Sequence, residues 1–154
     1  MIQIEKAIET DLDEILNLQR LAYQSEAILL NNFSIPPLMQ TLDEVQQEFA
    51  HGVFLKAVID GQIIGSVRGY IQDGTLHIGK LIVHPEYRGR GIGTQLLQAI
   101  EDACPDYRYE LFTSAKSEKN IRLYERQGYC RFAEKQVNPE LRFVYLEKAD
   151  ARHE

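Results

Sequence analysis

The spacing of hydrophobic residues predicts two helices in the first third of the chain. Residues 2–7 read as a short strand, and Thr10 then offers an N-cap before apolar residues at helical spacing. Thr41 and Glu44 match a capping box, so a second short helix is expected to extend to about Phe49.

The segment between these two helices, NNFSIPPLMQ at residues 31–40, is expected to be irregular. Pro36 and Pro37 disfavour a helix there, and each also drives the residue before it toward extended geometry. No element is therefore predicted in this segment.

From residue 53 the hydrophobic period becomes two, as in strands with one buried face. The strand-like runs are Val53–Ile59, Gln62–Ile71 and Thr75–Val83. Asp60-Gly61 and Asp73-Gly74 join them, and Asp-Gly suits the positive φ angles of a two-residue type I′ turn. The pattern predicts an antiparallel meander.

Helical and strand-like runs alternate after the meander. Apolar residues from Ile92 to Ala103 have helical spacing, and Pro105 follows them. A further helix is expected at Glu118–Gln127, and strands at Tyr109–Thr113, Arg131–Gln136 and Arg142–Glu147. The predicted order of elements is β-α-α-β-β-β-α-β-α-β-β, which is an α/β (α+β) arrangement with about seven strands and four helices.

The third meander strand contains an irregularity. Leu76 and Ile78 are followed by Leu81 and Val83, so the alternation slips by one residue across Gly79-Lys80. One face stays buried only if an extra residue absorbs the slip, which predicts a β-bulge. A bulge separates the strand from its next neighbour, either to make a site or only to shape the sheet.

Composition narrows the class of protein. With 44% apolar and 26% charged residues, the 154 residues are expected to form a single domain over residues 1–154. No membrane span or basic leader is visible, so we expect a soluble, cytoplasmic protein. The net charge of -6 argues against a nucleic-acid partner. Cys104 and Cys130 lack metal-ligand spacing, so we expect reduced structural thiols and no metal.

Residues 84–93, HPEYRGRGIG, lie between the third meander strand and the next predicted helix. The first amides of a helix attract anions, and glycine lets a phosphate approach the backbone closely. Arg88 and Arg90 add donors and charge. A pyrophosphate site is indicated, although a plain glycine-rich turn has similar features. A P-loop lysine is missing, and Thr94 replaces the third glycine of the dinucleotide fingerprint.

Two motifs resemble those of the GCN5-related N-acetyltransferase (GNAT) family. VHPEYRGRGIGTQLL at residues 83–97 is similar to its acetyl-coenzyme A motif, and SEKNIRLYERQGY at residues 117–129 is similar to its second motif. The order of elements is also similar, so the resemblance covers nearly the whole chain. It implies a central mixed, mostly antiparallel sheet in which the bulged strand 75–83 and the next strand splay apart around the pantetheine arm of the cofactor.

The resemblance also assigns residues to acetyl-coenzyme A. It implies that the backbone of residues 81–83 binds the acetyl and pantetheine groups and that residues 89–94 hold the pyrophosphate. The residues expected to bind the cofactor are Leu81, Ile82, Val83, Arg88, Gly89, Arg90, Gly91, Ile92, Gly93, Thr94, Ser117, Asn120 and Tyr124. The family commonly has asparagine seven residues before this tyrosine, where this chain has Ser117. Either Ser117 or Asn120 could reach the pantetheine amide, and Ser117 could instead cap the helix.

The resemblance implies that Tyr124 is the general acid that protonates the departing thiolate. The alternative is a core tyrosine on the helix face shared with Ile121. A base is also needed, because an alkyl ammonium has a pKa of about 10.4 and must lose a proton before it attacks. Glu110, on the strand beside the splay, is the first candidate, followed by His77 and Glu26. Each of the three also fits an ordinary structural role.

The expected function is acetyl transfer from acetyl-coenzyme A to a primary amine, on a small molecule or a peptide, by direct attack. A coenzyme A-sensing module without turnover and a nucleotide-binding protein that uses only the glycine loop are the alternatives. Acidic residues dominate residues 9–51, which favours a cationic acceptor. The oligomeric state stays open, a homodimer included, and no membrane partner is expected.

Overall fold

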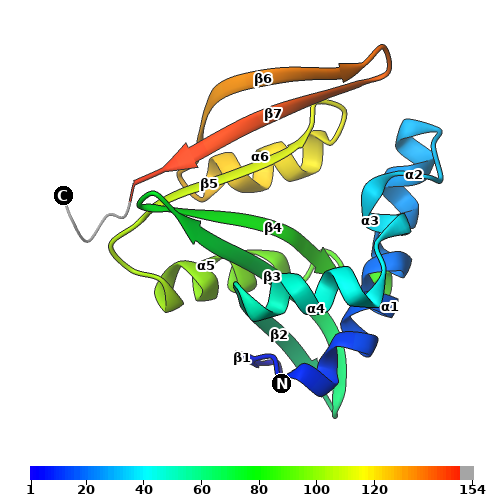
Figure 1. Ribbon diagram of the computed structural model, residues 1–154, viewed down its shortest axis with the longest axis vertical. Helices are drawn as coiled ribbons and strands as arrows, with labels where there is room; N and C mark the ends of the chain where they lie inside the picture. Colours follow the sequence, from blue (N-terminus) through cyan, green and yellow to red (C-terminus); the bar gives the residue numbers. More distant parts are fainter. Residues whose placement is uncertain (150–154) are drawn as a thin grey trace.

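Seven strands form one sheet in the order β1-β2-β3-β4-β5-β7-β6 in the computed structural model, which describes residues 1–149 (Figure 1). The strands are β1 (Gln3–Lys6), β2 (Val53–Ile59), β3 (Gln62–Gln72), β4 (Thr75–Val83), β5 (Arg108–Ser114), β6 (Cys130–Asn138) and β7 (Leu141–Lys148). Neighbouring strands are antiparallel, except for the parallel pair β4 and β5. The mixed, mostly antiparallel sheet expected from the sequence is confirmed.

The helices of the described chain are α1 (Leu12–Ala22), α2 (Gln24–Leu30), α3 (Pro36–Met39), α4 (Leu42–Ala50), α5 (Ile92–Ala103) and α6 (Glu118–Arg126). The capping box of α4 is confirmed, because the Glu44 amide donates to the Thr41 hydroxyl at 3.2 Å while the Glu44 carboxylate accepts from the Thr41 amide at 2.9 Å.

The prediction that residues 31–40 contain no regular element was wrong. Pro36 and Pro37 occupy the first positions of the short helix α3. A proline is tolerated there, because the first amides of a helix have no partner within the helix and the fixed φ of proline already suits it. Helix α2 was also not predicted; it follows α1 after Tyr23 and ends at Asn31, whose φ of 51° is left-handed.

Both Asp-Gly turns of the meander are confirmed. Asp60 and Gly61 have φ angles of 50° and 78°, and Asp73 and Gly74 have 52° and 77°. These angles match a two-residue turn that continues the right-handed twist of its strands. Both cysteines are free thiols, with Cys104 buried and Cys130 exposed.

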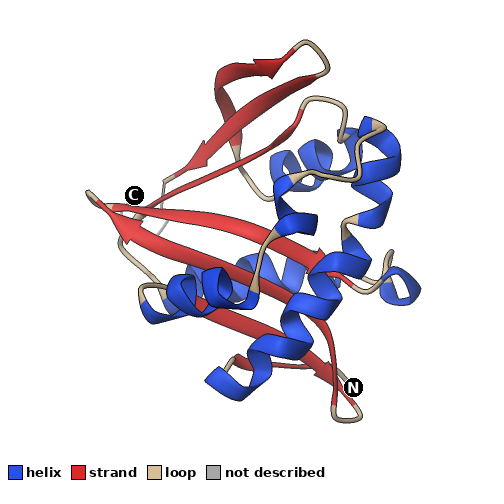
Figure 2. Ribbon diagram, turned by 45° about the vertical axis from the view of Figure 1, so that its right-hand side comes forward, coloured by secondary structure: helices blue, strands red, loops and turns tan. Residues whose placement is uncertain are grey.

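Helices cover the sheet on both faces (Figures 1 and 2). Helices α5 and α6 pack on one face, where their apolar residues join those of the strands in the larger core. Helices α1 and α4 pack on the opposite face over β2, β3 and the end of β4, around a second core. In both views that second face of β5, β6 and β7 carries no helix. Within residues 1–149, none of the helices is long and apolar enough to cross a membrane.

The predicted bulge is present in β4. Ser66 pairs with Ile82 and Arg68 with Gly79, so one residue of β3 faces two of β4. Lys80 lies at the bulge with a φ of 50°. The predicted splay is also present, because β4 and β5 pair only from Thr75–Arg108 to His77–Glu110 and then diverge. A V-shaped opening therefore separates the two strands beyond His77.

Candidate functional site

The edge of β4 that faces this opening has no strand partner. Residues 78–83 continue β4 along β3, but β5 no longer pairs with them. Backbone groups on such an edge need another hydrogen-bonding partner. A Cβ built on Gly79 would meet no atom within 4 Å, so the space beside the bulge is open. Leu81, Ile82 and Val83, which were expected to bind the cofactor through their backbone, lie on this edge.

The glycine loop leads from the end of β4 to the start of α5. Gly89 and Gly91 have φ angles of 79° and 80°, and a Cβ at either position would meet no atom within 4 Å. Gly91 is the N-cap of α5 and offers no side-chain cap, and the bond from the Gln95 amide to the Gly91 carbonyl closes the first turn. The amides of Ile92, Gly93 and Thr94 therefore lack partners within the helix. Open space, free amides and the dipole of a 12-residue helix suit a phosphate group.

The two arginines of this loop have different surroundings. Arg88 extends away from the loop and donates to the Ala22 carbonyl at 2.7 Å and to the Ser25 hydroxyl at 3.2 Å. Arg90 is exposed and lies over the Tyr87 ring, and its one hydrogen bond within residues 1–149 is a long one of 3.4 Å to the Glu86 carbonyl. Arg90 is thus free to reach an anion at the helix start, whereas Arg88 connects the loop to α1 and α2.

Tyr124 is a buried tyrosine whose hydroxyl has no hydrogen-bond partner in the described chain. The residue is 7% exposed, and its ring packs in the larger core near Tyr129. Its hydroxyl makes no hydrogen bond within residues 1–149. Burial raises the pKa of Tyr124, and the nearby Tyr23 and Glu26 raise it further. The phenol therefore keeps its proton and can donate it.

Ser117 was expected either to cap α6 or to reach the pantetheine. It stands at the N-cap of α6, but its side chain makes no capping bond, so that part of the prediction was wrong. Its hydroxyl instead donates to the Glu26 carboxylate of α2, at 2.8 and 3.0 Å. This contact brings Glu26 to the start of α6. The Asn120 side chain lies 3.4 Å from the Thr113 hydroxyl.

His77 and Glu110 meet at the closed end of the V. Their Nδ1 and Oε2 atoms are 3.7 Å apart, and the other Glu110 oxygen lies 2.8 Å from Arg108. The imidazole stacks on Tyr70 with ring centroids 4.8 Å apart. Two of the three predicted base candidates are thus neighbours, while Glu26 lies at the start of α6 with Ser117.

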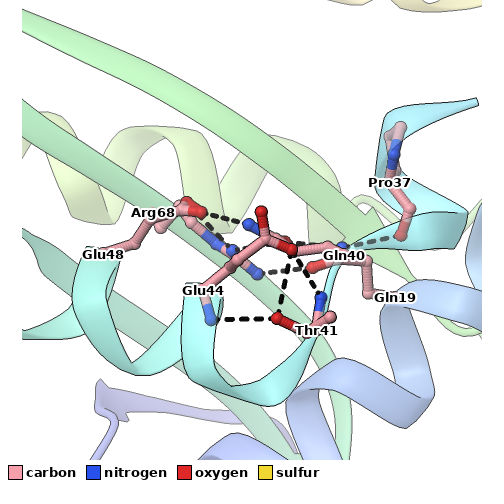
Figure 3. A network of polar contacts seen from close by, with 7 residues as sticks. All are labelled: Gln19, Pro37, Gln40, Thr41, Glu44, Glu48 and Arg68. Atoms are coloured by element: carbon pink, nitrogen blue, oxygen red, sulfur yellow. Dashed lines mark hydrogen bonds and ion pairs between the residues drawn. The ribbon is translucent and has the colours of Figure 1, made fainter.

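The sequence analysis did not single out Arg68, a buried arginine. It binds residues of α1, α4 and the segment between α3 and α4 on the second face of the sheet. Arg68 of β3 donates to Gln19 at 2.6 Å, to Gln40 at 3.3 Å and to Glu48 at 3.2 Å (Figure 3). Its guanidinium also lies 4.6 Å from the centre of the Phe54 ring. Burial lowers the pKa of Arg68, and Glu48 opposes that shift. A charged residue inside the apolar run IIGSVRGYI was the available signal for a buried, paired group.

This network fixes the segment between α3 and α4 over the sheet. The Gln19 amide donates to the Pro37 carbonyl and to Gln40, both at 2.9 Å, and Gln40 also donates to Glu48. A pocket of about 270 Å³ remains between this segment and β4. It is lined by Pro36, Met39, Gln40, Glu44 and Lys80.

Most acidic residues of the N-terminal segment bind neighbours in the fold. Asp11 pairs with Lys56 at 2.8 Å, and Glu14 accepts from the Ile63 amide at 2.9 Å. Glu26, Glu44 and Glu48 are engaged as described above, which leaves Glu9, Asp13 and Asp43 as exposed acids. Within the described part of the chain, no three His, Cys, Asp or Glu residues are grouped to hold a metal.

The fold with its V-shaped opening matches that of known acetyltransferases. The acetyltransferase (GNAT) family matches residues 12–129, so the chain belongs to this family.

Solved structures of N-acetyltransferases share the fold. The PaiA N-acetyltransferase of Thermoplasma acidophilum, in complex with coenzyme A, is 18% identical at a TM-score of 0.78, over 97% of this chain and 99% of that chain. The ribosomal-protein-S18-alanine N-acetyltransferase of Escherichia coli is 14% identical at 0.81, over 97% and 94%. The phosphinothricin acetyltransferase of Sinorhizobium meliloti, in complex with acetyl-coenzyme A, is 16% identical at 0.76, over 96% and 88%.

Proposed function

We propose that this protein is an acetyl-coenzyme A-dependent N-acetyltransferase that acts on a primary amine. The observation that carries the proposal is the unpaired edge of β4 leading directly to the free amides at the start of α5. A ligand with an extended, amide-containing arm followed by a pyrophosphate would fit, because the arm can bind the edge of β4 and the pyrophosphate the amides of α5. Family membership and structural neighbours that contain coenzyme A or acetyl-coenzyme A support the same ligand.

The direction of the V supports one position for the reaction. A pyrophosphate at Gly91 lies at the open end, so an arm that follows β4 inward ends toward His77 and Glu110 at the closed end. Acetyl-coenzyme A supplies an acetyl thioester when bound there. The overall reaction forms an N–C amide bond, breaks the C–S bond, removes a proton from the amine and returns a proton to the sulfur.

We assign the base to His77, with Glu110 as its partner. The imidazole is the side chain best suited to accept a proton at neutral pH, and a carboxylate beside one ring nitrogen orients the other. Glu110 itself is held by Arg108 at 2.8 Å, so one of its carboxylate oxygens is already engaged. Glu110 is therefore a positioning residue in this scheme.

We assign the acid to Tyr124. Its raised pKa keeps the proton on the hydroxyl and therefore available for the departing thiolate. Because complete transfer from such a phenol to a thiolate of pKa about 8.5 is uphill, its main contribution is a hydrogen bond to the developing charge. Solvent then supplies the proton that remains on the thiol.

The function is tested by adding acetyl-coenzyme A to the purified protein and measuring thiol release with amines, amino acids, polyamines, aminoglycosides and peptides. Release that depends on one class of amine supports the proposal. Calorimetric binding of coenzyme A without release for any amine indicates the sensing module instead. Preferential binding of ATP or NAD contradicts both.

The base is tested by His77→Gln. At neutral pH, kcat/KM is expected to fall by about 100-fold, the lower range for loss of a general base. The loss should shrink as the pH approaches the amine's own pKa of about 10, because the substrate then arrives deprotonated. His51→Gln, at the exposed end of α4, is the matched control. A pH-independent loss in His77→Gln would indicate a structural role.

A further inference from the structure

The pocket beside the bulge is suited to part of a small acceptor. Its volume of about 270 Å³ lies near the lower end of ordinary ligand pockets. One wall is the α3–α4 segment, which the Arg68 network holds in place (Figure 3), and the other is β4. The pocket therefore lies on the sheet face opposite α5 and α6, next to the bulge where β4 leaves β5.

The bulge directs Lys80 into this pocket. In a regular strand, position 80 would share a face with Ile78 and point into the larger core. Leu81 takes that face instead, and Ile82 joins the second core on the opposite side. Lys80 adopts a φ of 50°, an uncommon conformation for lysine, and its side chain lines the pocket. Uncommon backbone conformations of this kind gather at functional sites.

The Lys80 ammonium has no hydrogen bond or ion pair within residues 1–149. The other charged groups nearby have partners: Glu48 pairs with Arg68, and Glu44 accepts from the amide and hydroxyl of Thr41. Burial lowers the pKa of Lys80 and Arg68 lowers it further, whereas Glu48 raises it. A half-buried cation beside another cation gains most from a bound anion.

The same face of the neighbouring strands carries exposed aromatic rings. Phe112 is 51% exposed and lies 4.8 Å from Phe143 and 5.3 Å from Tyr145, measured between ring centroids. Phe112 is two residues from Glu110, so both point to the face that carries His77 and Lys80. In Figures 1 and 2 this face of β5 and β7 carries no helix. They offer an apolar surface on the other side of the V.

We propose that Lys80 binds a carboxylate of the acceptor, so that the amine acetylated by this protein belongs to an amino acid. The inference rests on the proposed N-acetyltransferase function and specifies its acceptor. The inference predicts an acceptor that carries a carboxylate, whereas the acidic residues in the range 9–51 favoured a cationic acceptor. Most of those acids contact other residues of the fold. The aromatic surface suits an apolar or aromatic side chain.

The kinetic test compares amino acids with their amides, for example L-phenylalanine with L-phenylalaninamide and L-leucine with L-leucinamide. Each pair keeps the amine and the side chain but removes the carboxylate charge. The wild-type protein is expected to favour the acids in kcat/KM by about 10-fold or more, because the free energy of a hydrogen bond between charged groups corresponds to at least a tenfold change. Lys80→Met should abolish that preference without slowing the amides, and Lys80→Arg should restore it. Lys6→Met, exposed on β1, is the matched control.

A binding test needs no turnover and separates this inference from the proposed function. Calorimetry with N-acetyl-L-phenylalanine and N-acetyl-L-phenylalaninamide, in the presence of coenzyme A, should show tighter binding of the acid to wild type and equal binding to Lys80→Met. Equal affinities in the wild type, or a preference that persists in Lys80→Met, would overturn the role of Lys80. Absence of thiol release with every amine would instead overturn the proposed function.

Discussion

The Tyr124 ring packs in the larger core, while its hydroxyl has no hydrogen-bond partner in the described chain. The buried ring explains why a packing role and a catalytic role both fit its place in the sequence. Removing the hydroxyl breaks no hydrogen bond within residues 1–149, because it makes none there. The two roles can therefore be separated by a change that keeps the ring.

Tyr124→Phe is expected to lower the single-turnover rate by about 100-fold, because the leaving thiolate loses its hydrogen-bond donor. The affinity for coenzyme A and the melting temperature should stay near those of the wild type. Tyr129→Phe is an informative comparison, because that hydroxyl donates to Glu101 at 2.7 Å in the core and its loss should lower stability rather than the chemical rate. Equal single-turnover rates in Tyr124→Phe and wild type would leave Tyr124 with packing alone.

At the scale of elements, the start of α5 tests whether this helix holds an anion. Gly91→Asp and Gly91→Asn form a matched pair, because both side chains tolerate the left-handed φ of 80° and both are good N-caps. They differ in charge alone. Aspartate suits the helix dipole, so it should not lower stability, yet it should weaken coenzyme A binding about 10-fold relative to asparagine by repelling the pyrophosphate.

Calorimetry and thermal unfolding of the two variants check this prediction together. A lower affinity in Gly91→Asp at an unchanged melting temperature supports an anion site. Equal affinities in the two folded variants would place the pyrophosphate elsewhere.

The elements that the sequence predicted are those whose signals are local. The meander follows from strict alternation and two Asp-Gly pairs, and the bulge follows from the slip in that alternation at Lys80. Helix α3 was missed because prolines at a helix start and prolines in a loop give the same local pattern. The contact between Glu26 and Ser117 joins residues 91 positions apart, so it depends on how α2 packs and has no local signal.

At the scale of the whole molecule, the V separates the two parts of the sheet on one side, while the larger core joins them through α5 and α6. Strands β4 and β5 join them at the closed end, and Glu26 of α2 reaches Ser117 of α6 near the other. Arg88 then connects α2 to the glycine loop through its bonds to Ala22 and Ser25. The glycine loop is thus linked to α1 and α2.

This link predicts different effects for the two arginines of one motif. Arg88→Met should loosen α2 and raise KM for the amine about 5-fold, since charged hydrogen bonds of this kind contribute on the order of 1.5 kcal/mol. The Kd for coenzyme A should change by less than about 2-fold. Arg90→Met should do the reverse, because Arg90 is exposed at the helix start and forms no ion pair within the described chain. Calorimetry with coenzyme A and steady-state kinetics with the amine separate the two effects. An equal loss of coenzyme A affinity in both variants would assign Arg88 to the phosphate and remove the link.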